Sequence, residues 1–224
     1  MEMTIKCPDC GKDLKITVEE IKKEAPKVSL FYKVKTKFSW SEIADMIHSG
    51  DMDFFSVGNE ISCTLKNGKE VTFVVAHINP YDENEVAFVL KDCLQERHTM
   101  IDMRKYLNEE IYDLLPDDLK AVIKKRTIKQ RIDGEIEKYE DKLWLLSKME
   151  IEGEAAESDV DDVHFDLFHD ERSRVKQIDG ETMWYWLRSP YTSTGCYFWS
   201  VGTNGVSDSS NASGSYGVAF GFLI

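Results

Sequence analysis

The stretch ISCTLKNGKEVTFVVAHI, residues 61–78, carries the strongest indication of the fold. Two runs rich in β-branched and aromatic residues flank Asn67-Gly68, a dipeptide that favours the tight turn of a β-hairpin. A third run of the same kind, EVAFVL at residues 85–90, follows a short distance along the chain. The sequence therefore predicts a three-stranded antiparallel meander over residues 61–90.

Helical patterns flank the meander. Upstream, residues 39–42 (SWSE) fit a capping box that opens a helix to about residue 49, where Gly50 ends it. Downstream, apolar residues recur at helical spacing over residues 100–125, and Pro116 suits the first turn of a second helix there. The patterns predict one helix before the meander and two after it.

Two further segments follow the predicted helices. The short apolar run DKLWLLS, residues 141–147, is typical of a buried strand. The acidic stretch over residues 150–162 lacks the spacing of a calcium-binding loop and predicts a solvated loop.

The last segment, residues 191–224, differs in composition from everything before it. Ser, Gly, Thr, Asn and aromatic residues dominate, and Asp208 is its only charged residue. It predicts short strands with a turn at Asn204-Gly205, and a core strand within GVAFGFLI at residues 217–224. The residues expected on its core side are Val201, Val206, Val218, Phe220 and Leu223.

These patterns predict an α+β fold with a mainly antiparallel sheet and two helices between its halves. Residues 1–26 form a separate appendage, a small tag or short helix that Pro26 ends. Residues 27–224 form the main domain, which begins with a strand at KVSLFYKVKTKF.

Five cysteines, an odd number, show no disulfide framework. Only Cys7 and Cys10 lie in a metal-binding pattern, since C-x-x-C followed by Gly forms a knuckle that presents two thiolates to zinc. A tetrahedral site needs two more ligands, and the chain has no second C-x-x-C. The alternatives are a closed zinc site, a relic knuckle, or a site that another chain completes. We expect these cysteines to be dispensable for the main domain and expect no other cofactor.

The formal net charge of −13 argues against nucleic acid and anionic membranes as partners, because both require a basic surface. No apolar run approaches the roughly 20 residues that span a bilayer, so we expect no membrane span. The start MEMTIKCPDC lacks the apolar core of a secretory signal. We therefore expect a protein made in the cytoplasm, which is compatible with association with a virion.

The run WYWLRSP at residues 184–190, with DKLWLLS at 141–147 and GVAF at 217–220, resembles a bacterial and phage family that has no settled function. The pattern extends over residues 27–224. Its matching elements, in order, are Gly58-Asn59, Asn67-Gly68, Leu107-Asn108 and the run from Trp186 to Pro190.

The resemblance implies a C-type-lectin-like fold, shared in outline with formylglycine-generating enzymes and with retroelement-diversified variable proteins. Many family members have Gly-Val-Arg-Pro where this chain has Gly-Val-Ala-Phe. That variant resembles the subset associated with diversity-generating retroelements.

The tail composition provides a separate indication. Such retroelements mutate template adenines, so a mutable AAC or AAT codon never becomes Met, Trp, Lys, Gln or Glu. Over residues 191–224 only Trp199 belongs to these types. The alternative is that any region rich in Ser and Gly lacks long side chains.

The tail also has the composition of antibody loops, in which Tyr and Trp give rigid contact area and Ser, Thr, Asn and Gly give adaptable hydrogen bonds. For each residue the alternative is that it fills a strand or turn, and Trp199 is the one best suited to a core. The candidate ligand-binding residues, within a recognition surface over residues 191–216, are Thr192, Thr194, Tyr197, Trp199, Thr203, Ser207, Ser209, Ser210, Ser213, Ser215 and Tyr216.

We therefore expect a ligand-binding variable protein of a phage or bacterium, with a protein or glycan on a cell surface as its partner. The alternative is a structural or assembly subunit, such as a phage tail or cell-surface component, without diversification. We expect no enzymatic activity, because the five histidines lie in no recognisable catalytic motif. Trp184, Trp186 and Arg188 suit a sugar platform or an anion clamp, but an arginine there more often pairs with a buried carboxylate.

Overall fold

The computed structural model describes residues 2–6, 13–17, 38–191 and 196–224. The chain forms two compact units, residues 1–37 and 38–224. In the first, β1 (Glu2–Lys6) and β2 (Asp13–Thr17) pair antiparallel. The prediction of a short helix in the appendage is therefore wrong over residues 13–17. This run, which contains β-branched residues, pairs as a strand. Several predictions fall on residues outside the described ones. These are the zinc ligands Cys7 and Cys10, the domain boundary at Pro26, and nearly all of the strand predicted from residue 27.

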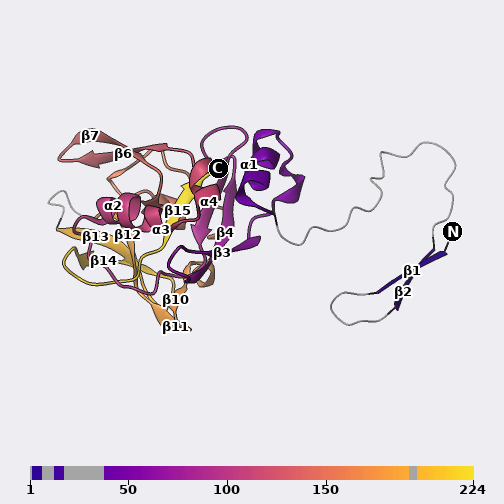
Figure 1. The fold of residues 1–224 in the computed structure, drawn as a ribbon. Helices are drawn as coiled ribbons and strands as arrows, with labels where there is room; N and C mark the ends of the chain where they lie inside the picture. The colour runs from indigo at the N-terminus through magenta and orange to yellow at the C-terminus, as the bar shows by residue number, and fades with distance from the viewer. Residues whose placement is uncertain (1, 7–12, 18–37, 192–195) are drawn as a thin grey trace. The chain divides into compact units, whose positions relative to one another are not determined.

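The second unit is built on a five-stranded antiparallel sheet in the order β3-β4-β5-β15-β8. The predicted meander is confirmed, because β3 (Glu60–Thr64), β4 (Glu70–Ile78) and β5 (Val86–Leu90) pair antiparallel in sequence. The last strand, β15 (Phe220–Leu223), lies between β5 and the short β8 (Trp144–Leu145). Figure 1 shows β15 in yellow within the main unit.

The helix α1 (Trp40–His48) packs on this sheet. Its capping box is confirmed, since the Ser39 hydroxyl accepts from the Glu42 backbone N–H and the Glu42 carboxylate accepts from the Ser39 backbone N–H. The indole of Trp40 makes edge contacts with three core rings, those of Phe73, Phe88 and Phe222, at centroid distances of 5.9, 5.7 and 5.9 Å. A 3-10 turn, η1 (Met52–Phe54), follows.

The two helices predicted after the meander are also present. The first is a continuous helical segment made of α2 (Met103–Lys105), the π-helical turn η2 (Tyr106–Ile111) and α3 (Tyr112–Leu114). The second, α4 (Asp117–Val122), begins after Pro116. The Asn108 side chain ties the first to the residues before β8, because it accepts from the backbone N–H groups of Lys142 and Leu143 and donates to the Leu143 carbonyl.

A second group of strands is not indicated in the sequence analysis. β6 (Arg126–Ile132) and β7 (Glu135–Asp141) form a hairpin, and β9 (Asp159–Val160) pairs with β6. The capped helix α5 (Lys148–Glu152) follows β8. Further along lie the 3-10 turn η3 (Arg172–Arg174) and the hairpin β10 (Lys176–Ile178) and β11 (Glu181–Met183).

The prediction of a solvated acidic loop over residues 150–162 is wrong. This stretch includes part of α5 and all of β9, and the side chains of Glu150 and Asp162 are only 0% and 2% exposed. Two buried arginines neutralise them, as described below.

Two strands of the tail, β13 (Tyr197–Val201) and β14 (Ser207–Asn211), form a three-stranded sheet with β12 (Tyr185–Pro190), here called the tail sheet. The turn predicted at Asn204-Gly205 is present between β13 and β14, with Gly205 at a φ of 81°. The fold class, α+β with mainly antiparallel sheets, is confirmed. No helix in the described part of the chain is long and apolar enough to span a bilayer.

Candidate functional site

The strand register separates the predicted contact residues onto two faces of the tail sheet. Trp199 pairs with Ser209, and Phe198 pairs with Ser210. Because alternate residues of a strand share a face, the two pairs point in opposite directions. The face that carries Trp199, here called the outer face, holds four predicted contact residues: Tyr197, Trp199, Ser207 and Ser209.

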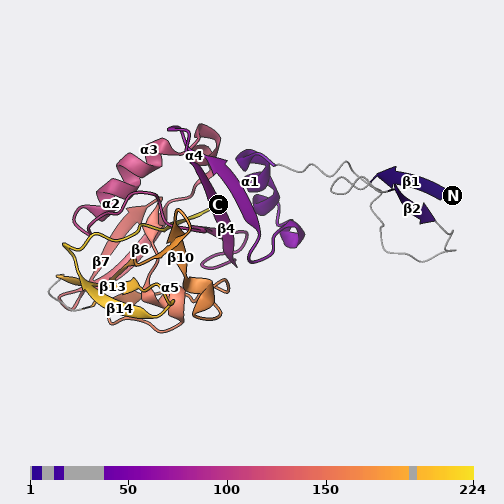
Figure 2. The ribbon, with the colours of Figure 1, turned by 90° about the horizontal axis from the view of Figure 1, so that it is seen from below.

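The outer face combines exposed aromatic rings with charged neighbours. Tyr191 and Tyr197 are 50% and 43% exposed. The half-buried Trp199 ring lies edge-on to Tyr191, with 5.0 Å between ring centroids, and the Lys148 ammonium lies 5.0 Å from the Trp199 ring centroid. Figure 2 shows α5, which carries Lys148, beside β13 and β14. This arrangement offers flat apolar contact area together with a cation.

A polar hollow of about 380 Å³ adjoins the outer face between α5 and the strands β13 and β14. Its lining includes Trp199, Ser207, Lys148 and the carboxylates of Glu152 and Glu154. Lys148 forms ion pairs with Glu152 at 2.9 Å and Glu154 at 3.2 Å. Hydroxyl, carboxylate and ammonium groups around an aromatic ring can bind the polar groups of a protein or glycan surface.

The other predicted contact residues lie elsewhere. Thr203, in the β13–β14 turn, and Ser213 and Ser215, after β14, are exposed. Ser210 is buried and shares a hydrogen bond with Ser200, while Tyr216 packs on Trp186 at 4.6 Å between ring centroids.

Two predicted contact residues, Thr192 and Thr194, lie outside the described residues. The prediction that Val206 lies in the core is wrong, because this residue is 43% exposed beside the hollow. Val201, Val218, Phe220 and Leu223 are buried as predicted.

The β13–β14 turn depends on the absence of a side chain at Gly205. A Cβ there would lie 1.8 Å from the Glu171 carbonyl oxygen, and the φ of 81° disfavours any L side chain. We expect Gly205→Ala to lower the free energy of unfolding, measured by urea titration, by at least about 2 kcal/mol. Gly134→Ala is the control, because Gly134 has a φ of 85° but no atom within 4 Å of its Cβ position. Equal losses in both variants would contradict the role of the Glu171 contact.

A buried ion network supports the tail sheet from within the domain. The Arg188 guanidinium binds Glu150 and Asp162, and Arg126 binds the same two carboxylates at 2.5 and 2.7 Å. Tyr81 also donates to Glu150, at 2.6 Å. The expected pairing of Arg188 with buried carboxylates is therefore confirmed.

The charges of this network balance. Burial by itself would raise the pKa of Glu150, but Arg126 and Arg188 outweigh burial and hold that pKa at about 2. Burial raises the pKa of Asp162, although both arginines oppose it. The same carboxylates raise the pKa of Arg188 in spite of its burial. Two arginines face two carboxylates in these ion pairs, so their formal charges cancel, which suits a structural role.

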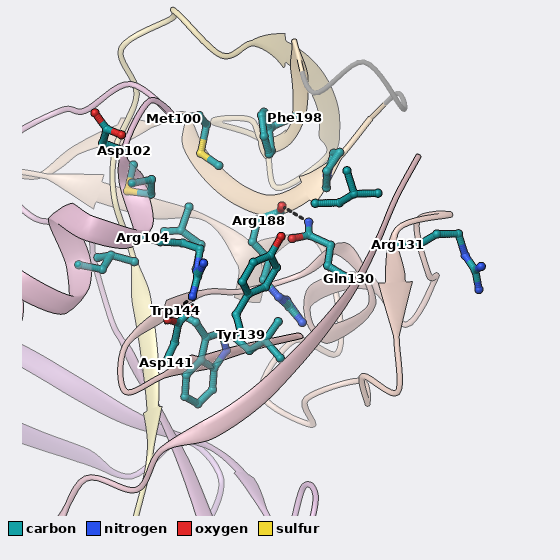
Figure 3. Close-up of a pocket in the computed structure, with 16 residues that line it drawn as sticks. Met100, Asp102, Arg104, Gln130, Arg131, Tyr139, Asp141, Trp144, Arg188 and Phe198 are labelled. Atoms are coloured by element: carbon teal, nitrogen blue, oxygen red, sulfur yellow. Dashed lines mark hydrogen bonds and ion pairs between the residues drawn. The ribbon is translucent and has the colours of Figure 1, made fainter. Parts of the chain in front are cut away.

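An apolar pocket of about 310 Å³ was not predicted from the sequence (Figure 3). It lies between the first helical segment after the meander, the β6–β7 hairpin, β8 and the strands β12 and β13. Met103, Ile128, Tyr139, Trp144 and Phe198 are among its lining residues. Because these come from separate segments, no local motif could have indicated the pocket.

Residues 87–224, more than half of the chain, match the model of a family described as a domain of unknown function, DUF6273. The chain belongs to this family. Searches of curated proteins and of solved structures found no match. The DUF6273 match begins within β5, so α1, β3 and β4 precede it. They nevertheless share its core, since Trp40 contacts Phe88 and Phe222.

Metal binding by this DUF6273 chain stays a prediction. The described residues contain no group of three or more His, Cys, Asp or Glu side chains that could hold a metal ion. Cys7 and Cys10, the proposed zinc ligands, are not among those residues.

Proposed function

We propose that this protein is a non-enzymatic recognition module that binds a protein or a glycan on a cell surface through the outer face of its tail sheet. The observation that carries the proposal is the pair of exposed rings, Tyr191 and Tyr197, around the half-buried Trp199, with hydroxyl side chains beside them on paired strands. Such aromatic side chains bury much area on binding and lose little conformational entropy.

The support beneath this face favours the same function. The opposite face of β12 and β13 is anchored by Trp186, which is fully buried and donates from its indole nitrogen to the His98 carbonyl at 2.8 Å. Ser200 on β13 is also fully buried. Substitution of the exposed side chains is therefore expected to cost little folding free energy. Stability and recognition then depend on different residues.

The proposal also includes the fold and the diversification of the tail that the family resemblance implies. We take the domain to be C-type-lectin-like and its tail to be a target of a diversity-generating retroelement in a phage or bacterium. The sequence of the surrounding DNA tests this extension. We expect a template repeat that differs from the codons of residues 191–216 only at adenines, beside a reverse transcriptase gene. Without such a template, and with relatives varying at every base, diversification is abandoned and the binding module alone is retained.

Binding is tested with the labelled full chain on a glycan array and on a panel of intact bacterial cells. We expect saturable binding that Tyr197→Ala weakens by about tenfold or more, because truncation of a central aromatic contact has effects of that size. Ile136→Ala is the control, since Ile136 is 47% exposed on β7, outside the outer face.

Equal weakening by both variants would place recognition elsewhere. If the chain instead self-associates and Tyr197→Ala abolishes that association in light scattering, the outer face is an assembly contact and the structural-subunit alternative holds.

A further inference from the structure

The strand β7 forms an open edge of the sheet β7-β6-β9, because β6 is its only neighbour among the described strands. Its seven residues pair with β6 without a shift in register. Proteins commonly protect an exposed edge with a proline or a bulge, and β7 has neither. Figure 1 shows β7 at the margin of the main unit. The edge is therefore regular enough to accept a further strand.

The register identifies the backbone groups that this edge exposes. The Arg131 backbone N–H donates to the Ser158 carbonyl, so Arg131 is directed toward β9. Its neighbour Gln130 is then directed toward β7, where it pairs with Glu137. Alternate residues of β7 point the other way, and in the described part of the chain their N–H and C=O groups have no backbone partner. These outward-directed residues are Ile136, Lys138 and Glu140.

The charge on this edge is mainly negative. Glu135, Glu137 and Glu140 are exposed, and Lys138 is the only basic residue of β7. Glu137 and Glu140 accept hydrogen bonds from the hydroxyl groups of a tyrosine and a threonine, which leave their charge in place. A second copy of the chain would bring the same acidic strand and a formal net charge of −13, and like charges on facing strands are unfavourable. The edge therefore favours a basic segment of another protein.

We propose that β7 binds an extended segment of a partner protein, rich in lysine or arginine, as an additional antiparallel strand. The outward N–H and C=O groups of β7 form the ladder of hydrogen bonds that gives affinity for an extended chain. Basic side chains opposite Glu135, Glu137 and Glu140 give specificity. This proposal does not depend on recognition by the outer face.

The first test uses a synthetic peptide of sequence TKFTKTK, blocked at both ends, with the full chain. In the antiparallel register its three lysines lie opposite Glu140, Glu137 and Glu135. Calorimetry is expected to show saturable binding that is at least about tenfold tighter than that of the charge-reversed peptide TEFTETE, and that weakens at high salt. Absence of saturable TKFTKTK binding, or equal affinity for the two peptides, would overturn the proposal.

Hydrogen exchange in ¹⁵N-labelled protein tests the register. The amides of Ile136, Lys138 and Glu140 are expected to exchange rapidly in the free chain and at least about tenfold more slowly when TKFTKTK saturates it. The amides of Glu137 and Tyr139, which are directed toward β6, are expected to be protected in both states. If the peptide protected other amides and left the outward three unchanged, it would bind elsewhere and the proposal would be wrong.

Two variants at one position separate strand pairing from charge attraction. Lys138→Pro removes the central outward N–H but no hydrogen bond to β6, so it is expected to weaken TKFTKTK binding by about tenfold or more. Lys138→Ala is the matched control, because it keeps the N–H and is expected to bind at least as tightly as the parent chain. Protection of the Glu137 amide in Lys138→Pro shows that the hairpin remains folded.

Two outcomes of these variants would refute the proposal. Equal affinity of Lys138→Pro and Lys138→Ala would mean that charge attraction acts without strand pairing. A dimer of the parent chain in light scattering that Lys138→Pro dissociates would mean that a second copy occupies the edge.

Discussion

Replacing Arg188 with methionine is expected to lower the free energy of unfolding by about 3–5 kcal/mol, the usual cost of removing one partner from a buried ion pair. The substitution leaves Glu150 and Asp162 with only Arg126 as their cation, although both carboxylates are almost fully buried. One buried negative charge then lacks compensation. Urea unfolding of the full chain near pH 7 measures the loss.

Lys129→Met is the matched control. Lys129 pairs with Asp161 in the same part of the molecule, but the two side chains are 37% and 66% exposed. Water already solvates such a pair, so its loss is expected to change the free energy of unfolding by less than about 1 kcal/mol. Similar losses in the two variants would show that the buried network contributes no more than an exposed pair.

Replacing Trp40 with alanine is expected to destabilise the domain by about 3–5 kcal/mol, because it leaves a large cavity among closely packed rings. Trp40 is 6% exposed and contacts Phe73, Phe88 and Phe222. The effect is informative because Trp40 lies before the family match at residues 87–224, whereas Phe88 and Phe222 lie within it. Thermal and urea unfolding provide the measurement.

Phe54→Ala is the control for this variant. Phe54 lies on η1, directly after α1, but its ring is 58% exposed. We expect a change within about 0.5 kcal/mol, as for most surface substitutions. If Trp40→Ala were equally mild, α1 would be an accessory to the family domain and not a part of its core.

Elements specified by nearby residues could be predicted from the sequence. The β3–β4 hairpin depends on the Asn67-Gly68 turn, and α1 depends on the reciprocal capping of Ser39 and Glu42. The β6–β7 hairpin was missed although Asp133-Gly134 marks its turn, because its strands are rich in charged residues that suggest neither strand nor core.

The prediction of a solvated loop over residues 150–162 was wrong for two different reasons. Ser147 and Glu150 form a capping box that the sequence displays, so α5 was predictable. The burial of Glu150 was not, because it depends on Arg126 and Arg188, which are distant in sequence. A charged residue is normally solvated, and only the folded structure shows that its compensating charges lie beside it.

The sequence predicted which segment carries the candidate site, but not which side chains of that segment are exposed. Composition pointed to the tail, but the division between exposed Tyr197 and buried Ser210 depends on the strand register. A shift of one residue would exchange the two faces. Composition carries no information about that register.

The position of β15 has a consequence for the folding pathway. β5 is buried along its whole length and pairs on one side with β15, which comes from the opposite end of the domain. A chain emerging from the ribosome therefore exposes an apolar, half-paired strand until residues 220–223 are available. Pairing between such distant segments folds slowly, and an open apolar strand edge can pair with other chains. Aggregation during synthesis is thus a hazard that the finished sheet, with β15 in place, no longer shows.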